Sequence, residues 1–401
     1  MTRADAAVKL KSMSKLDQAG AAMNWMFPTL PYTIRISYKG ASRAVGSGPE
    51  KVEMACKTEA AVASLASSDL SEFLDHYALG DADLNGDMYS FVGARNFVRQ
   101  DKLWRIKLKY QLRYLTTALF PSDIRRKLRA VSSHYDLPNE FILSYLDKKT
   151  KAYSCAMWKD PLKIGNLDDE ELADAQHNKF DQALTALQVQ PGDKFIDIGT
   201  GYGYAPWLAE TKYGCKNTLG ITLSQNQVDD GFSKNIKLLH YLEVPADGSF
   251  DKLHTCGMIS HLDRSEIERY YAHCYGMLKS GGKAWFHAII PQANNAGLTN
   301  YTTISGTFSQ KYVFPDHFQF PLHVHLKIIE KLGFRVKHIN FRYGHYAKTL
   351  RHWYKLYVEN LPRTRHMITP TIERAWHLYL TYASTMDGPQ SVLKQILCEK
   401  P

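Results

Sequence analysis

The chain has 401 residues, 44% of them hydrophobic and 22% charged, which is the composition of a globular protein long enough for two domains. It contains no run of the roughly 18–20 apolar residues that a membrane span requires, no apolar signal-peptide core, and no CxxC pair or metal-ligand spacing among its 6 cysteines. We therefore expect a cytoplasmic protein with reduced thiols and no metal, whose net charge of +10 attracts an anionic partner such as nucleic acid or acidic phospholipid.

Residues 1–100 predict a small α+β domain. Stretches rich in small residues, such as "ACKTEAAVASLASSDLSEFLDHYALG", precede the turn-rich "GDADLNGD". Turn residues of this kind separate short helices and strands.

Residues 101–133 predict a basic amphipathic linker. Apolar residues alternate with lysines and arginines in "DKLWRIKLKYQLRYL", and "DIRRKLRAV" follows. The spacing fits a strand with one basic face as well as a helix with an apolar stripe, so periodicity leaves the element open. Such a surface suits an anionic membrane surface and predicts a peripheral location there, although a solvated face without a partner fits the same pattern.

Residues 134–401 predict one α/β domain. Residues 101–185 read as largely helical, and "DDEELADAQHNKFDQALTALQVQ" begins with acidic residues, as the positive end of a helix dipole favours. From residue 190 the apolar runs "KFIDIG", "TLGITL", "KLHTCGM" and "KAWFHAII" alternate with helix-length segments. This alternation predicts a mostly parallel sheet with right-handed crossovers.

The first of these runs ends in the glycine turn "FIDIGTGYGY", residues 195–204. The strand ends at Ile198, and Gly199, Gly201 and Gly203 let the backbone approach a ligand and turn into a helix. A dinucleotide site favours GxGxxG, whereas this turn reads GxGxG with Asp197 inside the strand, and it has no phosphate-loop lysine.

The segments after the turn narrow the choice of ligand. The second strand ends as "GITLSQNQ", which offers Thr222, Ser224 and Gln227 near a ribose and no carboxylate. The turn "HYLEVPADGSFD" and the Gly-Gly turn of "MLKSGGKAWFHAI" follow in order. This order predicts a Rossmann-like methyltransferase dependent on S-adenosylmethionine (SAM). A Rossmann-like domain for another nucleotide is the alternative.

Several longer segments match the motifs of one family in the same order. They are "HYDLPNEFILSYLDKKTKAYSCAMW", "DAQHNKFD", "DIGTGYGY", "GITLSQNQ", "FHAIIP", "QKYVFP" and "HYAKTLRHWY". Over residues 130–400 the chain closely resembles the cyclopropane fatty acid synthases. The stretch "LGDADLNGDMY" more loosely resembles the small lipid-facing domain of the full-length bacterial enzymes. Relatives include mycolic acid methyltransferases and plant alkaloid N-methyltransferases.

The resemblance implies a set of cofactor-binding residues. Tyr153 and Ser154, with Gly199 and Gly201, are expected to meet the amino-acid part of SAM. Thr222 and Gln227 are expected to reach the ribose, and Tyr241 and Leu242 to flank the adenine. Asp197, Gly203 and Leu223 of the same turn and strand end complete the set.

The resemblance also implies a bound bicarbonate that acts as general base. Its pocket would consist of Cys155, His287, Ile289 and Tyr346, with Ser260 and His261 at the position of a family motif. Methyl transfer to an alkene leaves a carbocation, which an aromatic ring such as that of Tyr346 stabilises by roughly 0.5–2 kcal/mol. A base must then remove a proton from the delivered methyl group so that the cyclopropane ring closes.

The chain departs from the family at this motif, because it reads "GMISHLD" where relatives read "GMFEHVG". Ser260 therefore stands in place of a glutamate that orients the bicarbonate. A hydroxyl can donate to bicarbonate but brings no negative charge to help draw off its proton. In addition, "DIGTGYGY" replaces "DIGCGWGG", and His240 replaces an aspartate before Tyr241.

These observations predict an enzyme that uses SAM to convert unsaturated acyl chains of membrane phospholipids into cyclopropane fatty acids. A methyl-branched or methylenated product, a small-molecule N-methyltransferase, and a lipid-binding protein without catalysis are the alternatives. Nucleic acid is not an expected partner, since the chain has no base-flipping or target-reading motif. The oligomeric state stays open, with a homodimer as one arrangement.

Overall fold

The computed structural model describes residues 13–99, 137–291, 304–314, 318–385 and 391–401. The chain forms two compact units. The smaller unit takes in residues 1–116, 301–313 and 368–385, and the larger unit takes in residues 117–300, 314–367 and 386–401. The basic amphipathic linker predicted at 101–133 lies outside the described residues.

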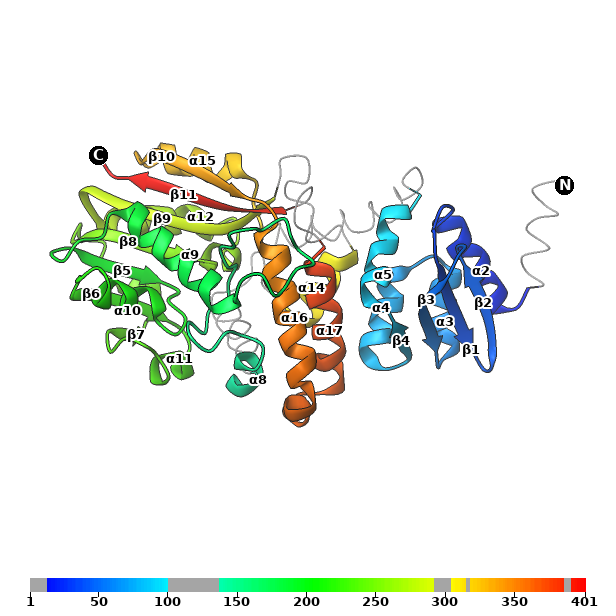
Figure 1. The fold of residues 1–401 in the computed structure, drawn as a ribbon. Helices are drawn as coiled ribbons and strands as arrows, with labels where there is room; N and C mark the ends of the chain where they lie inside the picture. The colour runs from blue at the N-terminus through cyan, green and yellow to red at the C-terminus, as the bar shows by residue number, and fades with distance from the viewer. Residues whose placement is uncertain (1–12, 100–136, 292–303, 315–317, 386–390) are drawn as a thin grey trace. The chain divides into compact units, whose positions relative to one another are not determined.

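The smaller unit is built on a four-stranded sheet in the order β2-β1-β3-β4 (Figure 1). Its strands are β1 (Thr33–Tyr38), β2 (Ala41–Val45), β3 (Glu50–Cys56) and β4 (Ala82–Gly86), and its N-terminal helices are α2 (Lys15–Met26), α3 (Glu59–Ala66), α4 (Leu70–Leu79) and α5 (Met88–Gly93). Val52, Met54 and Cys56 alternate with more exposed residues along β3, so one face of the sheet packs against helices. The unit thus combines helices with a sheet.

Two helices from much later in the chain join the smaller unit: α14 (Ile304–Tyr312) and α17 (Pro370–Ala383). The Tyr312 hydroxyl donates to Asp75 of α4 at 2.9 Å. Arg374 donates to the backbone oxygens of Tyr77 and Ala82 at 2.9 and 3.0 Å, and pairs with Asp83 at 2.8 Å. The predicted domain boundaries at residues 100 and 134 would place both helices in the catalytic domain. In the structure they belong to the smaller unit.

The larger unit holds a seven-stranded sheet in the order β10-β11-β9-β8-β5-β6-β7 (Figure 1). Its strands are β5 (Lys194–Ile198), β6 (Asn217–Thr222), β7 (Ile236–Leu238), β8 (Phe250–Cys256), β9 (Leu278–Pro291), β10 (Arg335–Arg342) and β11 (Ser391–Glu399). Neighbouring strands from β9 to β7 are parallel, while β11 and β10 add antiparallel pairs at the β9 edge. The mostly parallel α/β sheet predicted from the alternating apolar runs is confirmed.

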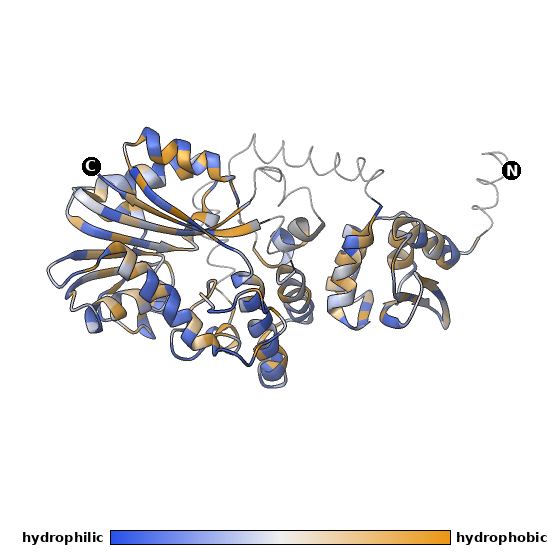
Figure 2. Cartoon of the chain, turned by 45° about the horizontal axis from the view of Figure 1, so that its top comes forward, coloured by the Kyte–Doolittle hydropathy of each residue, from blue (hydrophilic) through white to orange (hydrophobic). Residues whose placement is uncertain are grey.

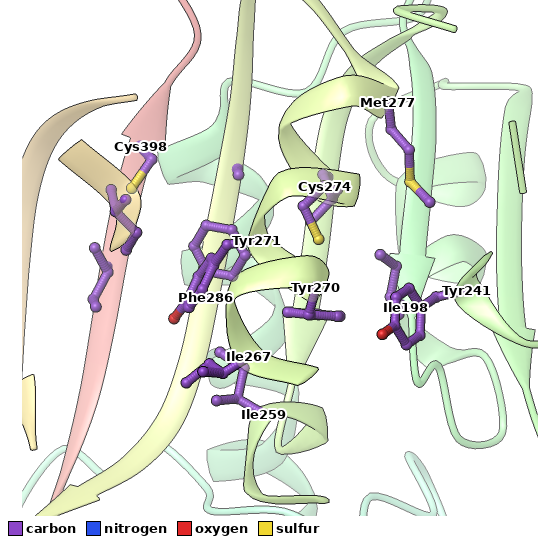
Figure 3. Close-up of a cluster of buried hydrophobic side chains, with 14 of the residues drawn as sticks. Ile198, Tyr241, Ile259, Ile267, Tyr270, Tyr271, Cys274, Met277, Phe286 and Cys398 are labelled. Atoms are coloured by element: carbon purple, nitrogen blue, oxygen red, sulfur yellow. The ribbon is translucent and has the colours of Figure 1, made fainter. Parts of the chain in front are cut away.

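Helices cover both faces of this sheet. The larger unit contains α8 (Asn139–Leu143), α9 (Leu172–Leu187), α10 (Tyr204–Thr211), α11 (Gln225–Asp229), α12 (Glu266–Met277), α15 (Leu322–Lys331) and α16 (His345–Thr364). One face packs with α12 and α15, where Ile198, Tyr270 and Phe286 belong to a single buried cluster (Figure 3). The other face packs with α9 and α10, through residues such as Phe195 and Trp285.

The expectation that residues 101–185 are largely helical is wrong for residues 144–171, which form turns and irregular structure. Turn-forming residues explain the difference, because "KDPLKIGNLDD" places Pro, Gly, Asn and Asp close together. Figure 2 shows hydrophilic and hydrophobic residues mixed along the helices of the larger unit, as helices buried on one side require. Among the residues that the structure describes, no helix combines the length and apolarity needed to cross a bilayer.

Candidate active site

A cavity of about 210 Å³ lies at the carboxyl ends of β5, β6 and β8 in the larger unit. Ligands of open parallel α/β sheets bind at this edge. The candidate residues that line it are Tyr153, Ser154, Asp197, Gly199, Gly201, Thr222, Leu223, Gln227, Tyr241 and His261. The cavity thus brings together most of the cofactor-binding residues named from the sequence. Gly203 and Leu242 are not among its lining residues.

The glycine turn adopts a backbone that only glycine tolerates well. Gly199, Gly201 and Gly203 have φ values of 74°, 58° and 76°, all in the left-handed region. A Cβ atom added at Gly201 would meet nothing within 4 Å, so this part of the turn opens toward the cavity. A Cβ atom at Gly203 would instead collide with Ile236. Gly203 therefore serves packing at the start of α10, while Gly199 and Gly201 line the ligand space.

The end of β6 presents polar groups to the same cavity. The Thr222 hydroxyl donates to Gln227 Oε1, and the Ser224 N–H donates back to the Thr222 oxygen at 3.3 Å. These bonds hold the strand end against the first turn of α11. No carboxylate stands there, so a ribose would meet hydroxyl and amide groups.

His240 and Tyr241 line the cavity beyond β7, and their rings pack in a tilted arrangement with centroids 4.5 Å apart. His240 occupies the place of the family aspartate, and its Nδ1 accepts from the Leu242 N–H at 3.3 Å. Burial lowers the pKa of His240, so its ring is neutral at pH 7. This wall is an uncharged aromatic surface of the kind that an adenine ring packs against.

A buried Asp197–His254 pair forms part of the cavity wall. Asp197 Oδ1 accepts from His254 Nδ1 at 2.7 Å, and Asp197 Oδ2 accepts from the Thr200 hydroxyl at 2.7 Å. Both oxygens of the carboxylate are thus already bonded within the protein. His254 also lines the cavity, although it was not identified from the sequence. The sequence feature that could have identified it is a histidine within an otherwise mostly apolar strand, "KLHTCGM".

Lys179 is a second residue that the sequence reasoning missed. It is only 1% exposed, and its ammonium donates to Ser154 Oγ and, at 2.7 Å, to Gln176 Oε1. Gln176 in turn donates to the Ser154 backbone oxygen at 2.7 Å. Burial lowers the pKa of Lys179. Ser154, which is expected to contact the amino-acid part of SAM, is therefore fixed by hydrogen bonds from two side chains of α9.

Three of the candidate catalytic residues belong to one small apolar cluster. Cys155, Ile289 and Tyr346 pack together with Met157 and Leu393. Because Cys155 directly follows Ser154, the cluster adjoins the residues that line the cavity. Apolar side chains packed beside a cavity help to exclude water from a reactive carbon.

Ser260 and His261 lie in a short 3-10 turn, Met258–His261, after β8. His261 lines the cavity, and burial lowers its pKa to about 4, so it is neutral at pH 7. Ser260 is buried and its carbonyl accepts from the Phe318 N–H at 2.7 Å, but it is not among the cavity-lining residues. The turn therefore presents an imidazole, and no carboxylate, to the cavity.

His287 lies on β9, two residues before Ile289, and is only 2% exposed. Its Nδ1 lies 3.4 Å from Gln395 Nε2, and its Nε2 is buried without a hydrogen-bond partner among the described residues. Burial, with the nearby charge of Lys179, holds the pKa of His287 well below its usual value. His287 is therefore neutral and has one ring nitrogen available to a ligand.

Most of the chain matches one known protein family. A family model described as "Mycolic acid cyclopropane synthetase" matches residues 122–391. The chain is 32% identical over 294 residues to a "Probable fatty acid methyltransferase" of Pseudomonas putida. This alignment covers 70% of this chain and 71% of that protein. It is 26% identical over 381 residues to "Sphingolipid C9-methyltransferase 1" of Gibberella zeae, covering 89% of this chain and 67% of the relative.

A solved structure of the same family resembles the larger part of this chain. The mycolic acid cyclopropane synthase CmaA1, solved in complex with SAH and CTAB, superposes with a TM-score of 0.60 at 26% identity. The superposition covers 68% of this chain and 98% of that structure. The structural similarity to CmaA1 therefore concerns about two thirds of the chain.

Proposed function

Because the chain belongs to the mycolic acid cyclopropane synthetase family, we propose that it transfers a methyl group from SAM to a double-bond carbon of an unsaturated membrane-lipid acyl chain. The chain is a SAM-dependent methyltransferase of this lipid-modifying family. Phospholipid is the proposed substrate and a cyclopropane fatty acid the proposed product. One observation carries the proposal: the cavity beside the glycine turn is lined by Ser154, and the next residue, Cys155, belongs to the apolar cluster with Ile289 and Tyr346.

The cavity fits SAM by the groups that it offers. Gly201 leaves open space above the turn, Thr222 and Gln227 offer hydroxyl and amide groups, and Tyr241 offers an aromatic face. When bound, SAM supplies an electrophilic methyl group on a sulfonium. The chain's own residues orient that group toward the apolar cluster, which removes much of the entropic barrier to methyl transfer.

The chemistry then requires protection of a cation on the acyl chain. The π electrons of the double bond form the new carbon–carbon bond as the sulfur–methyl bond breaks, which leaves the second alkene carbon positively charged. In this proposal the ring of Tyr346, which packs against the cluster, stabilises that charge by roughly 0.5–2 kcal/mol. Met157 and Leu393 help to keep water from adding to the cation.

Loss of a proton completes the reaction. Removal from the delivered methyl group closes the three-membered ring, whereas removal from a neighbouring chain carbon leaves a methyl-substituted alkene. A methylene alkene forms when a 1,2-hydride shift first moves the cation to the methylated carbon and a proton then leaves the methyl group. The unpartnered Nε2 of His287 fits a hydrogen bond to bicarbonate, the base implied by the family resemblance. Because Ser260 supplies no carboxylate near this base, the methylated alkene is the second candidate product.

The test uses the full chain with SAM carrying a ¹³C methyl group and vesicles of monounsaturated phosphatidylglycerol. Acyl chains are released and examined by NMR. Upfield ring-proton signals bearing ¹³C support cyclopropanation, and a labelled methyl or exocyclic methylene signal supports the second candidate. A parallel arm with an unsaturated sphingolipid distinguishes the lipid class. Absence of label from every lipid, with SAM binding intact by calorimetry, would overturn the proposal.

A further inference from the structure

A row of polar side chains crosses the sheet beside the candidate active site. Asn340 of β10 pairs with Gln395 of β11, and Gln395 pairs with His287 of β9. His287 pairs in turn with Cys256 of β8, which lines the cavity. Residues paired directly across neighbouring strands lie on the same face of a sheet. The row therefore connects the β10 edge of the sheet to the cavity.

Arg342 fixes the orientation of the Gln395 side-chain amide. Arg342 Nε lies 2.8 Å from Gln395 Oε1, and Asn340 Nδ2 approaches the same oxygen at 3.4 Å. A guanidinium only donates hydrogen bonds, so the atom facing it must be the amide oxygen. The amide NH₂ group of Gln395 consequently points toward His287 Nδ1, 3.4 Å away.

This orientation determines which nitrogen of His287 carries the hydrogen. An NH₂ group offers only hydrogens, so Nδ1 can face it only as a lone pair. A neutral imidazole with a lone pair on Nδ1 carries its hydrogen on Nε2. Nε2 is the buried nitrogen that has no partner among the described residues, so its N–H is available to a ligand.

The charged and titratable groups that act on His287 keep it in this neutral form. Burial of the ring opposes a positive charge on it, and so do the nearby cationic side chains of Lys179 on α9 and Arg342 on β10; His254 of β8 and His345 of α16 are the titratable neighbours that would add to this effect if protonated. Cys155 and Tyr346 lie in the neighbouring cluster with Ile289. The ring is thus prepared to donate one hydrogen bond, and its only lone pair is directed at Gln395.

We propose that Gln395, oriented by Arg342, is a positioning residue that keeps the His287 hydrogen on Nε2, so that His287 donates to an oxygen atom at the reaction centre and does not itself act as the base. The identity of that centre rests on the proposed function. The tautomer of His287 does not, because it follows from the protein's own contacts.

The direct test is ¹⁵N NMR of the full-length protein with ¹⁵N-labelled histidine rings, in which His287 is assigned from the signal missing in His287→Gln. The inference expects an Nε2-protonated neutral ring in the native protein. In Gln395→Glu the new carboxylate accepts from His287, so the hydrogen is expected to move to Nδ1. A native ring protonated on Nδ1 or on both nitrogens, or a Gln395→Glu ring unchanged from native, would overturn the inference.

Kinetics provide the second readout. Gln395→Leu and Gln395→Glu are expected to lower kcat for methyl transfer roughly 10–100-fold, by analogy with the loss of the hydrogen-bond partner that orients a metal-bound imidazole. The KM for SAM should stay within about twofold, because the cavity is not altered. Gln182→Ala is the matched control: Gln182 accepts from the other side of Arg342 at 3.3 Å, is exposed, and should leave kcat unchanged.

The two proposals fail in different ways. If no lipid is methylated but the native His287 ring is protonated on Nε2 and switches in Gln395→Glu, the positioning inference stands and the proposed function falls. If lipid is methylated and Gln395→Leu retains native kcat in a folded protein, the positioning role falls. Should Gln395→Leu fail to fold, Arg342→Met is used instead. It removes the donor that orients the Gln395 amide and should lower kcat in the same way.

Discussion

At the residue scale, Ser260 is the departure from the family motif that bears most directly on the proposed chemistry. The position holds a glutamate in the motif that the chain otherwise resembles, and here it holds a buried serine in a 3-10 turn. A hydroxyl cannot supply the negative charge that a carboxylate brings to a neighbouring base. The product of the reaction is therefore expected to depend on this one side chain.

We expect Ser260→Glu to raise the share of cyclopropane in the lipid product, because a carboxylate near the base favours proton removal from the delivered methyl group. The measurement is the ratio of ring to alkene signals in ¹³C-labelled acyl chains, with Ser260→Ala as the control that changes the side chain without adding charge. An unchanged ratio in a folded Ser260→Glu protein would contradict a role of this position in ring closure.

His254 is the second residue-scale case. It is 1% exposed and bonds to Asp197, which is 2% exposed, at 2.7 Å. His254→Val removes one of the two donors to this buried carboxylate and should lower the free energy of unfolding by about 1–3 kcal/mol. Urea denaturation measures the loss, and His254→Asn, whose amide can still donate, should lose less. Equal stability of all three proteins would show that the pair does not support the cavity wall.

At the scale of elements, α16 depends on neutral histidines. His345 Nδ1 accepts from the Trp158 N–H at 3.0 Å, and His352 stacks on the Trp158 ring with centroids 4.5 Å apart. Burial lowers the pKa of both histidines to about 4. The unfolded chain, with histidine pKa values near 6.5, therefore binds more protons than the folded chain between about pH 6.5 and pH 4.

The stability contributed by these histidines is accordingly complete above about pH 6.5 and is lost as the pH falls toward about 4. We expect the urea midpoint to be lower at about pH 5 than at about pH 7. Carboxylates of lowered pKa are still ionised at both pH values, so they do not account for the difference. His352→Gln should reduce this difference, since glutamine does not titrate. A midpoint that is the same at both pH values would contradict the neutral state of the α16 histidines.

The elements also show what the sequence can and cannot predict. The glycine turn and the "GITLSQNQ" strand end were recognisable because their functional groups lie within a few residues of one another. His254 and Asp197 are 57 residues apart, and His287 and Gln395 are 108 residues apart, so each contact exists only after the strands are paired. Strands β10 and β11 were not foreseen either, and without β11 the partner of His287 could not be named.

At the scale of the whole molecule, the proposed lipid substrate requires the enzyme to reach a membrane. The net charge of +10 and the basic run at 101–131 suggest that electrostatic attraction helps it to do so. That run lies outside the described residues, so this prediction depends on the sequence alone.

We expect binding to vesicles of phosphatidylglycerol to weaken with added salt, and to weaken further in a variant with Arg125, Arg126 and Lys127 changed to glutamate. Co-sedimentation with vesicles measures both effects, and neutral phosphatidylcholine vesicles are the control. If the triple variant sediments with anionic vesicles as well as the native protein does, the basic run is not the membrane-binding surface.

The assembly of the smaller unit from distant segments has a consequence for synthesis on the ribosome. Asp75 bonds to Tyr312, and the carbonyls of Tyr77 and Ala82 bond to Arg374, so α4 acquires these partners only after residue 374 has left the ribosome. Until then the nascent N-terminal segment exposes surface that α14 and α17 later cover, and it is a natural client for chaperones. Translation that stops before Pro370 would leave this unit unfinished, however complete its first hundred residues are.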